Sequence, residues 1–326
     1  MISREKATAD EETQRRNKEK LRHELGPVVC SALDNPDIVE IMVNPDGSIW
    51  LDCIKSGMEG TGEHVAFGRR MAALGTIAAI LGAEVNSKSS ILKGELPFDG
   101  SRVRGTVPPT SSGPGFCIRK HSSAVFPISR YLAEKRISDA HWTYLQNAIE
   151  EKKNILVAGG TGSGKTTFTN ALLDTLNKLN PMDRLVVMED TLELQYSSKN
   201  VYSLRTDGEN EITLQYLLKT ALQLRPDRII VGEVLGGEAL DLLKSWNTGH
   251  PGGISTLHAN SAESALTRLE LLVSEVSVSP MKELIGEVVD VVVFLKREAR
   301  KGPVVTEVLE VKGVDVKSGV YNCVSR

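Results

Sequence analysis

The sequence predicts an α/β protein in two parts, a smaller α+β domain followed by a larger domain built on a mostly parallel sheet. After residue 154, short aliphatic runs alternate with longer helical patterns. Uninterrupted aliphatic strands that alternate with helices are typical of a parallel sheet covered on both faces. Before residue 127, short apolar runs are separated by turn residues around one helical stretch, which favours an α+β domain. The predicted parallel strands are Ile155 to Ala158, Leu185 to Met188, Arg228 to Val231 and Ile254 to Leu257.

The first part of the chain begins with a polar segment of mixed charge, residues 1–24, which we expect to be a frayed or helical tail. The α+β domain covers 25–127. Its turn cluster Asn44-Pro45-Asp46-Gly47 lies between two apolar runs, and Arg69 to Gly82 has helical pattern. Strands are predicted over 38–43, 48–51, 91–96, 101–107 and 115–120.

Residues 128–151 have helical pattern and are predicted to bridge into the second domain, 152–326. The last aliphatic runs of that domain, 288–295 and 304–311, are predicted to add edge strands. Trp50, Trp142 and Trp246 are expected to pack into cores or domain joints.

Composition excludes several classes of protein. The chain has 326 residues, 40% hydrophobic and 25% charged, which is ordinary for a soluble globular protein of two domains. The four cysteines lie far apart without a C-x-x-C pair, so neither a zinc site nor a disulfide scaffold is expected. The longest apolar stretch, Met71 to Val85, is too short to cross a bilayer, and the amino terminus has no apolar signal segment. We therefore expect a cytosolic protein, attached to a membrane at most through a partner.

A phosphate-binding loop follows the first parallel strand. Gly159 to Thr166 reads GGTGSGKT and matches G-x-x-x-x-G-K-[ST]. Glycines let the loop curl so that backbone N–H groups and the helix N-terminus point at phosphate oxygens. Lys165 is predicted to reach the β- and γ-phosphates, and the Thr166 hydroxyl to bind Mg²⁺. The residues predicted to bind nucleotide are Gly160, Thr161, Gly162, Ser163, Gly164, Lys165, Thr166 and Thr167.

Acidic residues and a histidine end the neighbouring strands. Glu233 follows the strand that begins at Arg228, and Glu189 follows Leu185 to Met188, with Glu193 close behind. Ligands bind at the carboxyl ends of such strands. A carboxylate there can orient a water and accept its proton, or hold Mg²⁺ through water. His258 ends the fourth strand, where a γ-phosphate sensor would lie.

Four segments in this order resemble the secretion (traffic) ATPases of type II and type IV secretion systems and pilus motors. The segments resemble, in turn, the family's Walker A motif (159–166), its acidic box (187–193), its atypical Walker B motif ending in Gly-Glu (224–233) and its histidine box (248–260). The chain is most similar to conjugal-transfer ATPases of the TrbB kind, because 39–47 and 118–120 also match their amino-terminal domain. The tetracysteine zinc module of many pilus-assembly and type II members is missing, which favours the conjugation branch.

The resemblance implies a homohexameric ring in the cytoplasm, bound peripherally to inner-membrane components of a conjugative type IV secretion machine. The second domain would be RecA-like, and Mg²⁺-dependent ATP hydrolysis would power pilus assembly or substrate transfer. Glu233 would activate water or bind metal, Glu189 and Glu193 would support metal and water, and His258 would sense the γ-phosphate. Arginines of the amino-terminal domain would reach the phosphates: Arg119 and either Arg102 or Arg104, the other being solvated.

Two other functions share the same core. A nucleic-acid translocase or helicase would need a basic, aromatic-bearing channel, and the net charge of −3 and 5% aromatic content count against it. Nucleic acid is therefore not expected as a direct ligand. A nucleotide-gated scaffold would not require Glu189, Glu233 and His258. A small-molecule kinase is disfavoured because no segment resembles a lid for an acceptor substrate.

Overall fold

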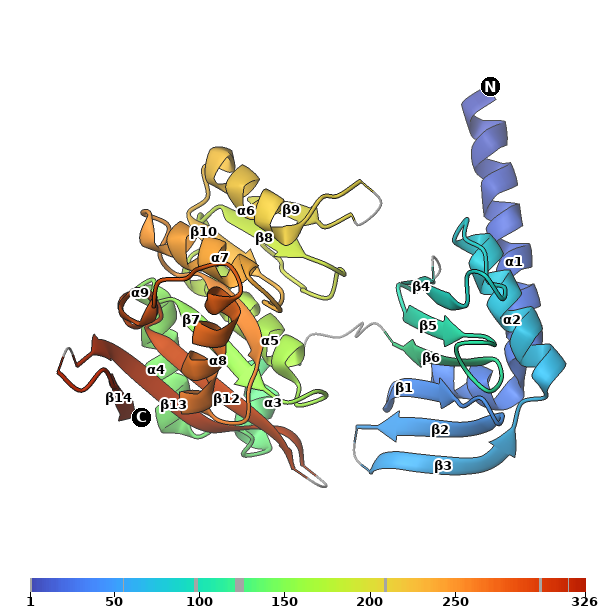
Figure 1. Ribbon diagram of the computed structural model, residues 1–326, viewed down its shortest axis with the longest axis horizontal. Coiled ribbons are helices and arrows are strands. Elements are labelled where there is room, and N and C mark those ends of the chain that lie inside the picture. Colours follow the sequence, from blue (N-terminus) through green and yellow to red (C-terminus); the bar gives the residue numbers. More distant parts are fainter. Residues whose placement is uncertain are drawn as a thin grey trace. The chain divides into compact units, whose positions relative to one another are not determined.

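The computed structural model describes residues 2–54, 56–96, 99–120, 126–207, 210–298, 301–315 and 317–326. The chain divides into two compact units, Met1–Ser123 and Ala124–Arg326 (Figure 1). None of the described helices is both long and apolar enough to cross a membrane.

The first unit is a six-stranded antiparallel sheet with the order β3-β2-β1-β6-β5-β4. Two helices lie side by side on one face of it (Figure 1). Apolar residues of both helices and alternate strand residues form its core, including Leu21, Leu74, Ile41 and Ile118. The elements are α1 (Ile2–Asp34), β1 (Ile38–Val43), β2 (Ser48–Cys53), β3 (Gly57–His64), α2 (Phe67–Ile80), β4 (Ile91–Glu95), β5 (Arg102–Thr106) and β6 (Gly115–Arg119).

Three features of this unit differ from the sequence prediction. The segment 1–24 is helical, which is one of the two forms expected, but it is not separate from the domain: residues from Ile2 belong to α1, and Leu21 is buried in the core. Within α1, Gly26 has non-helical backbone angles (φ 85°) just before Pro27. Strand β3 was not predicted, since its glycines and acids lack an apolar pattern. Trp50 does not pack into a core; its side chain is 41% exposed.

The second unit is an eight-stranded sheet with the order β14-β13-β12-β7-β11-β10-β8-β9. The strands from β12 to β9 are parallel, and β13 and β14 add antiparallel pairs. The strands are β7 (Ile155–Gly159), β8 (Leu185–Glu189), β9 (Val201–Arg205), β10 (Arg228–Val231), β11 (Ile254–His258), β12 (Val291–Glu298), β13 (Gly302–Val314) and β14 (Tyr321–Ser325).

Helices cover both faces of this sheet (Figure 1). Successive strand residues point to opposite faces, so Val157 joins one core and Leu156 the other. On one side pack α3 (Ile128–Ala133), α4 (Asp139–Glu150) and α5 (Lys165–Leu179). On the other side pack α6 (Leu214–Ala221), α7 (Glu238–Asn247), α8 (Ala262–Ser274) and α9 (Lys282–Val288), and the short 3₁₀ helix η1 (Leu222–Leu224) follows α6.

Two predictions for this unit are corrected. Residues 128–151 do not bridge two domains; they form α3 and α4, whose Tyr131, Trp142 and Leu145 are buried in the core of the second unit. The segment 288–295 does not form an edge strand, because β12 lies between β7 and β13. Its aliphatic side chains are buried on both faces, as an interior strand requires. The edge strands are β14 and β9, which were not predicted.

The parallel strands place the sequence motifs together. Because β7, β8, β10 and β11 run in the same direction, their carboxyl ends lie at one edge of the sheet. The phosphate loop, Glu189, Glu233 and His258 all follow or end these strands.

Candidate nucleotide-binding and catalytic site

The phosphate loop connects β7 to α5 with backbone angles that favour glycine. Gly162 and Gly164 have φ values of 69° and 87°, and Gly164 is the N-cap of α5. A Cβ on Gly164 would also lie 2.5 Å from Cγ of Pro303. Residues 160–162 are exposed, whereas Ser163 is buried. The loop is therefore open to a ligand on one side and held by the protein on the other.

Three predicted site residues contact one another beside this loop: Lys165, His258 and Glu233. The ammonium Nζ of Lys165 donates to the carbonyls of Gly159 (3.2 Å) and Gly160 (3.3 Å). It lies 3.2 Å from Nδ1 of His258 and 3.7 Å from Oε1 of Glu233. Nε2 of His258 is 3.2 Å from the same carboxylate oxygen. The strand ends thus bring the predicted phosphate-binding lysine, the predicted sensor and the predicted catalytic acid into contact.

These contacts fix the protonation of His258. An ammonium group can only donate, so Nδ1 of His258 accepts from Lys165. The ring proton is then on Nε2 and points to Glu233. A ring protonated on both nitrogens would place a donor against the ammonium, so the geometry favours the tautomer with its proton on Nε2.

Glu189 and Glu193 have different roles in the geometry. The buried Glu189 accepts hydrogen bonds through Oε1 from the backbone N–H groups of Glu193 and Leu194, both at 2.8 Å. This bends the segment after β8 back toward α5. Glu193 then accepts a hydrogen bond through Oε2 from the Thr166 hydroxyl at 3.2 Å. Glu189 shapes the loop, and Glu193 contacts the predicted metal ligand.

Two residues near the site were missed by the sequence reasoning. Asn170 of α5 donates to the carbonyl of Glu193 (3.2 Å) and accepts from the N–H of Gln195 (2.9 Å). It is a polar residue beside an apolar run, which was the available signal. Arg297, near the end of β12, has Nη1 3.7 Å from the position that a Cβ on Gly162 would occupy. Its signal was a basic residue just beyond a predicted strand.

The three predicted arginines belong to the first unit. Arg102 and Arg119 are cross-strand partners on β5 and β6, and Arg104 lies two residues further along β5. Residues two apart on a strand share a face, so Arg102 and Arg104 both lie on the face opposite the buried Val103. Arg104 is exposed, and Arg102 and Arg119 are half-buried.

The oxygen groups at the site suit Mg²⁺. They are the Thr166 hydroxyl and the carboxylates of Glu193, Glu233 and Glu189, and Mg²⁺ prefers such hard donors. Among the described residues, no group of three His, Cys, Asp or Glu side chains is arranged to hold a metal by itself. Mg²⁺ usually takes one or two protein ligands and completes its shell with water and phosphate oxygens.

Comparison with known proteins assigns the chain to a family. The type II/IV secretion system protein family matches residues 86–302. The chain belongs to this family. It is 43% identical over 293 residues to the probable conjugal transfer protein TrbB of Sinorhizobium fredii, and the matched region covers 90% of this chain and 89% of that protein. It is 44% identical over 294 residues to the conjugal transfer protein TrbB of Rhizobium radiobacter, spanning 90% of each.

The fold is shared with a solved ATPase. The ATPase DotB of Yersinia pseudotuberculosis superimposes with a TM-score of 0.65 at 18% identity, covering 87% of this chain and 78% of that chain. The prediction from the four motifs is confirmed: the chain is a secretion ATPase similar to conjugal-transfer proteins.

Proposed function

We propose that this ATPase works as a homohexameric ring that powers pilus assembly or substrate transfer in a conjugative type IV secretion machine. The contact of Lys165 with Glu233 and His258 carries the catalytic part of the proposal. The similarity to TrbB proteins supports the conjugative part. The second unit would be the RecA-like domain of the family, with its phosphate loop at the carboxyl edge of the sheet.

The geometry supports distinct roles for the residues of the loop. The backbone N–H groups of Gly160 to Thr167 would surround the phosphates of ATP, with Lys165 on the β- and γ-phosphates. The hydroxyl oxygen of Thr166 would bind Mg²⁺, which supplies charge neutralisation. The hydroxyl hydrogen of Thr166 would still be donated to Glu193. Glu189 would support the metal indirectly through the loop that it holds, or through water.

The same geometry suggests how binding prepares hydrolysis. Lys165 is held by His258 and Glu233, so an arriving phosphate must draw the ammonium away from both groups. The Glu233 carboxylate, released from Lys165, can then orient a water and accept its proton. His258 would continue to donate a hydrogen bond from Nε2 to the same carboxylate. His258 would register the γ-phosphate because its Nδ1 loses the partner that it has in this structure.

The proposal includes the first unit and the partners. Arg119 and Arg102 would reach the phosphates and neutralise charge, with Arg104 as the alternative, and their common face on the sheet supports a joint role. The ring would lie in the cytoplasm on inner-membrane components of the secretion machine.

The Mg²⁺-ATPase rate per subunit, measured against protein concentration with molecular mass recorded alongside, tests the ring. We expect the specific rate to rise as hexamers form, because arginines from assembled subunits complete the sites. A flat rate from a monomer would contradict the ring. Stimulation by added DNA would favour the translocase alternative.

A further inference from the structure

The strand that leads to Glu233 is only partly paired with its neighbour. Strand β10 pairs with β8 along its whole length, from Arg228 to Val231. Within the described residues, its register with β11 consists of Ile230 with Ile254 and Val231 with Ser255. Beyond Val231 the connection continues, since the N–H of Val234 donates to the carbonyl of Thr256 at 3.0 Å. The amino-terminal half of β10 therefore lies outside the β11 ladder.

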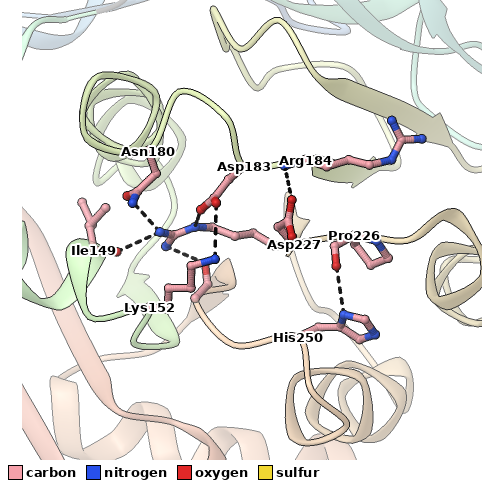
Figure 2. Close-up of polar contacts among 10 residues, drawn as sticks. Ile149, Lys152, Asn180, Asp183, Arg184, Pro226, Asp227 and His250 are labelled. Carbon is pink, nitrogen blue, oxygen red and sulfur yellow. Dashed lines mark hydrogen bonds and ion pairs between the residues drawn. The ribbon is translucent and has the colours of Figure 1, made fainter.

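Side chains connect the two segments where the ladder is missing. The buried indole Nε1 of Trp246 donates to the carbonyl of Ile229 at 3.1 Å. Nδ1 of His250 lies 3.0 Å from the carbonyl of Pro226, and since a carbonyl can only accept, Nδ1 carries the proton. Arg228 reaches back through Nη1 to the carbonyl of Gly252 at 3.4 Å. Figure 2 shows the ring of His250 pointing at the carbonyl of Pro226.

Two glycines make room for these contacts. Gly252 has a φ of 83°, and a Cβ there would lie 2.6 Å from Nη1 of Arg228. A Cβ on Gly253 would overlap the indole Nε1 of Trp246 and lie 2.7 Å from the carbonyl of Ile229. The close approach of this loop to the start of β10 thus accounts for His250, Gly252 and Gly253.

Arg228 extends the connection to the rest of the catalytic domain. Its side chain is 1% exposed, and its Nε donates to Asp183 at 2.7 Å. Its Nη2 donates to the carbonyl of Ile149 and to Oδ1 of Asn180, both at 2.9 Å. These three partners are labelled in Figure 2. Asn180 is the C-cap of α5, the helix that begins at the phosphate loop. Asp183 precedes β8, the strand that ends at Glu189. The guanidinium of Arg228 therefore connects the end of α5 with the start of β8. The opposite ends of these two elements, the start of α5 and the end of β8, carry residues of the candidate site.

We infer that Trp246, His250 and Arg228 are positioning residues that replace the missing half of the β10–β11 ladder. They fix the position of β10 along the sheet, and with it the place of Glu233 relative to His258. The inference rests on the proposed catalytic roles of Glu233 and His258. The hydrogen bonds of Trp246 and His250 go to the carbonyls of Ile229 and Pro226 and not to the phosphate loop or α5, so the loss of either bond affects hydrolysis and spares nucleotide binding. Displacements of about 1 Å at a catalytic group are enough to lower a rate strongly.

The test compares two pairs of variants in the full-length ATPase. Trp246→Phe removes the indole donor, and Trp142→Phe makes the same change in the buried part of α4. His250→Ala removes the ring donor, and His141→Ala breaks a similar contact, in which Nε2 lies 2.6 Å from the carbonyl of Arg326. His250→Asn restores a donor near the position of Nδ1. The measurements are kcat, the Kd for ADP, and the fraction folded by circular dichroism.

We expect Trp246→Phe and His250→Ala to lower kcat per folded protein at least fivefold, with the Kd for ADP within twofold of the unaltered ATPase. His250→Asn is expected to recover kcat to within twofold, and the variants at Trp142 and His141 to keep it. If Trp246→Phe does not fold, the His250 series decides.

The inference is overturned if both variants keep their kcat, or if kcat and nucleotide affinity fall together. Glu233→Gln, measured in parallel, separates this failure from that of the proposed function. If Glu233→Gln hydrolyses ATP normally, the catalytic assignment itself is wrong. If Glu233→Gln is inactive and the positioning variants are fully active, only the positioning role is wrong.

Discussion

At the scale of single residues, Glu189 has a structural role that can be separated from its proposed chemical role. Its Oε1 is the acceptor for two backbone N–H groups in the loop that carries Glu193. Glu189→Ala leaves both donors without this acceptor, at a cost of about 1–3 kcal/mol each. We expect a loss of about 2–6 kcal/mol in the free energy of unfolding, measured by urea denaturation.

Glu189→Gln separates the two roles, since the amide keeps an acceptor oxygen but not the charge. We expect near-normal stability and reduced Mg²⁺-dependent hydrolysis. Unchanged hydrolysis in Glu189→Gln would limit Glu189 to shaping the loop.

Arg297 offers a second residue-scale prediction. Its guanidinium lies beside Gly162 of the phosphate loop, and its neighbour Lys296 is exposed on the opposite face of β12. Attraction between unit charges a few ångströms apart in solvent is worth about 1 kcal/mol. We therefore expect Arg297→Ala to weaken ATP binding about fivefold in an equilibrium titration. Lys296→Ala is the control, and an equal effect of both variants would show only a general change of charge.

Residue types and spacing were enough to name most members of the candidate site, for a physical reason. A phosphate loop needs fixed residue types at fixed spacing, and acids at the ends of parallel strands must share an edge, so Lys165 and Glu233 could be found directly. The neighbours that hold them could not. Trp246 was expected only to pack into a core or a domain joint, and its donated hydrogen bond depends on a gap in the ladder that no local pattern reveals.

At the scale of elements, the packing of helix α2 on strand β5 shows where glycine is required and where it is not. Gly105 of β5 lies under the buried Leu74, and a Cβ there would overlap the Leu74 side chain. Gly75, one residue along α2, is exposed with no atom within 4 Å of a would-be Cβ. We expect Gly105→Ala to destabilise the protein by about 1–3 kcal/mol through overpacking. Gly75→Ala is expected to stabilise it by roughly 0.5–1 kcal/mol. Thermal and urea unfolding measure both, and a stabilising Gly105→Ala would contradict the packing account.

Elements with a strong pattern were predicted, and those defined by their neighbours were not. The strands of the parallel sheet have near-continuous aliphatic sequences, which local patterns reveal. Strand β3 is rich in glycine and acids and is a strand because it pairs with β2. Strand β12 lies between β7 and β13, and this place depends on the topology of the sheet. The same aliphatic run could also form an edge strand, so its sequence does not distinguish the two positions.

At the scale of the whole molecule, the chain combines two units with separate cores. The second unit contains the phosphate loop, the acids and His258, whereas Arg102, Arg104 and Arg119 lie on one face of the first. In the proposed ring motor, these arginines would reach the phosphates, so that the movement of one unit against the other would depend on the state of the phosphates.

The central claim is that the phosphate loop binds ATP while Glu233, placed by β10, hydrolyses it. The most direct test measures ATP binding and single-turnover hydrolysis in Glu233→Gln and Lys165→Ala. We predict that Glu233→Gln binds ATP with the affinity of the unaltered protein and loses at least a hundredfold in hydrolysis rate, whereas Lys165→Ala loses binding as well. Hydrolysis by Glu233→Gln at the unaltered rate would contradict the account.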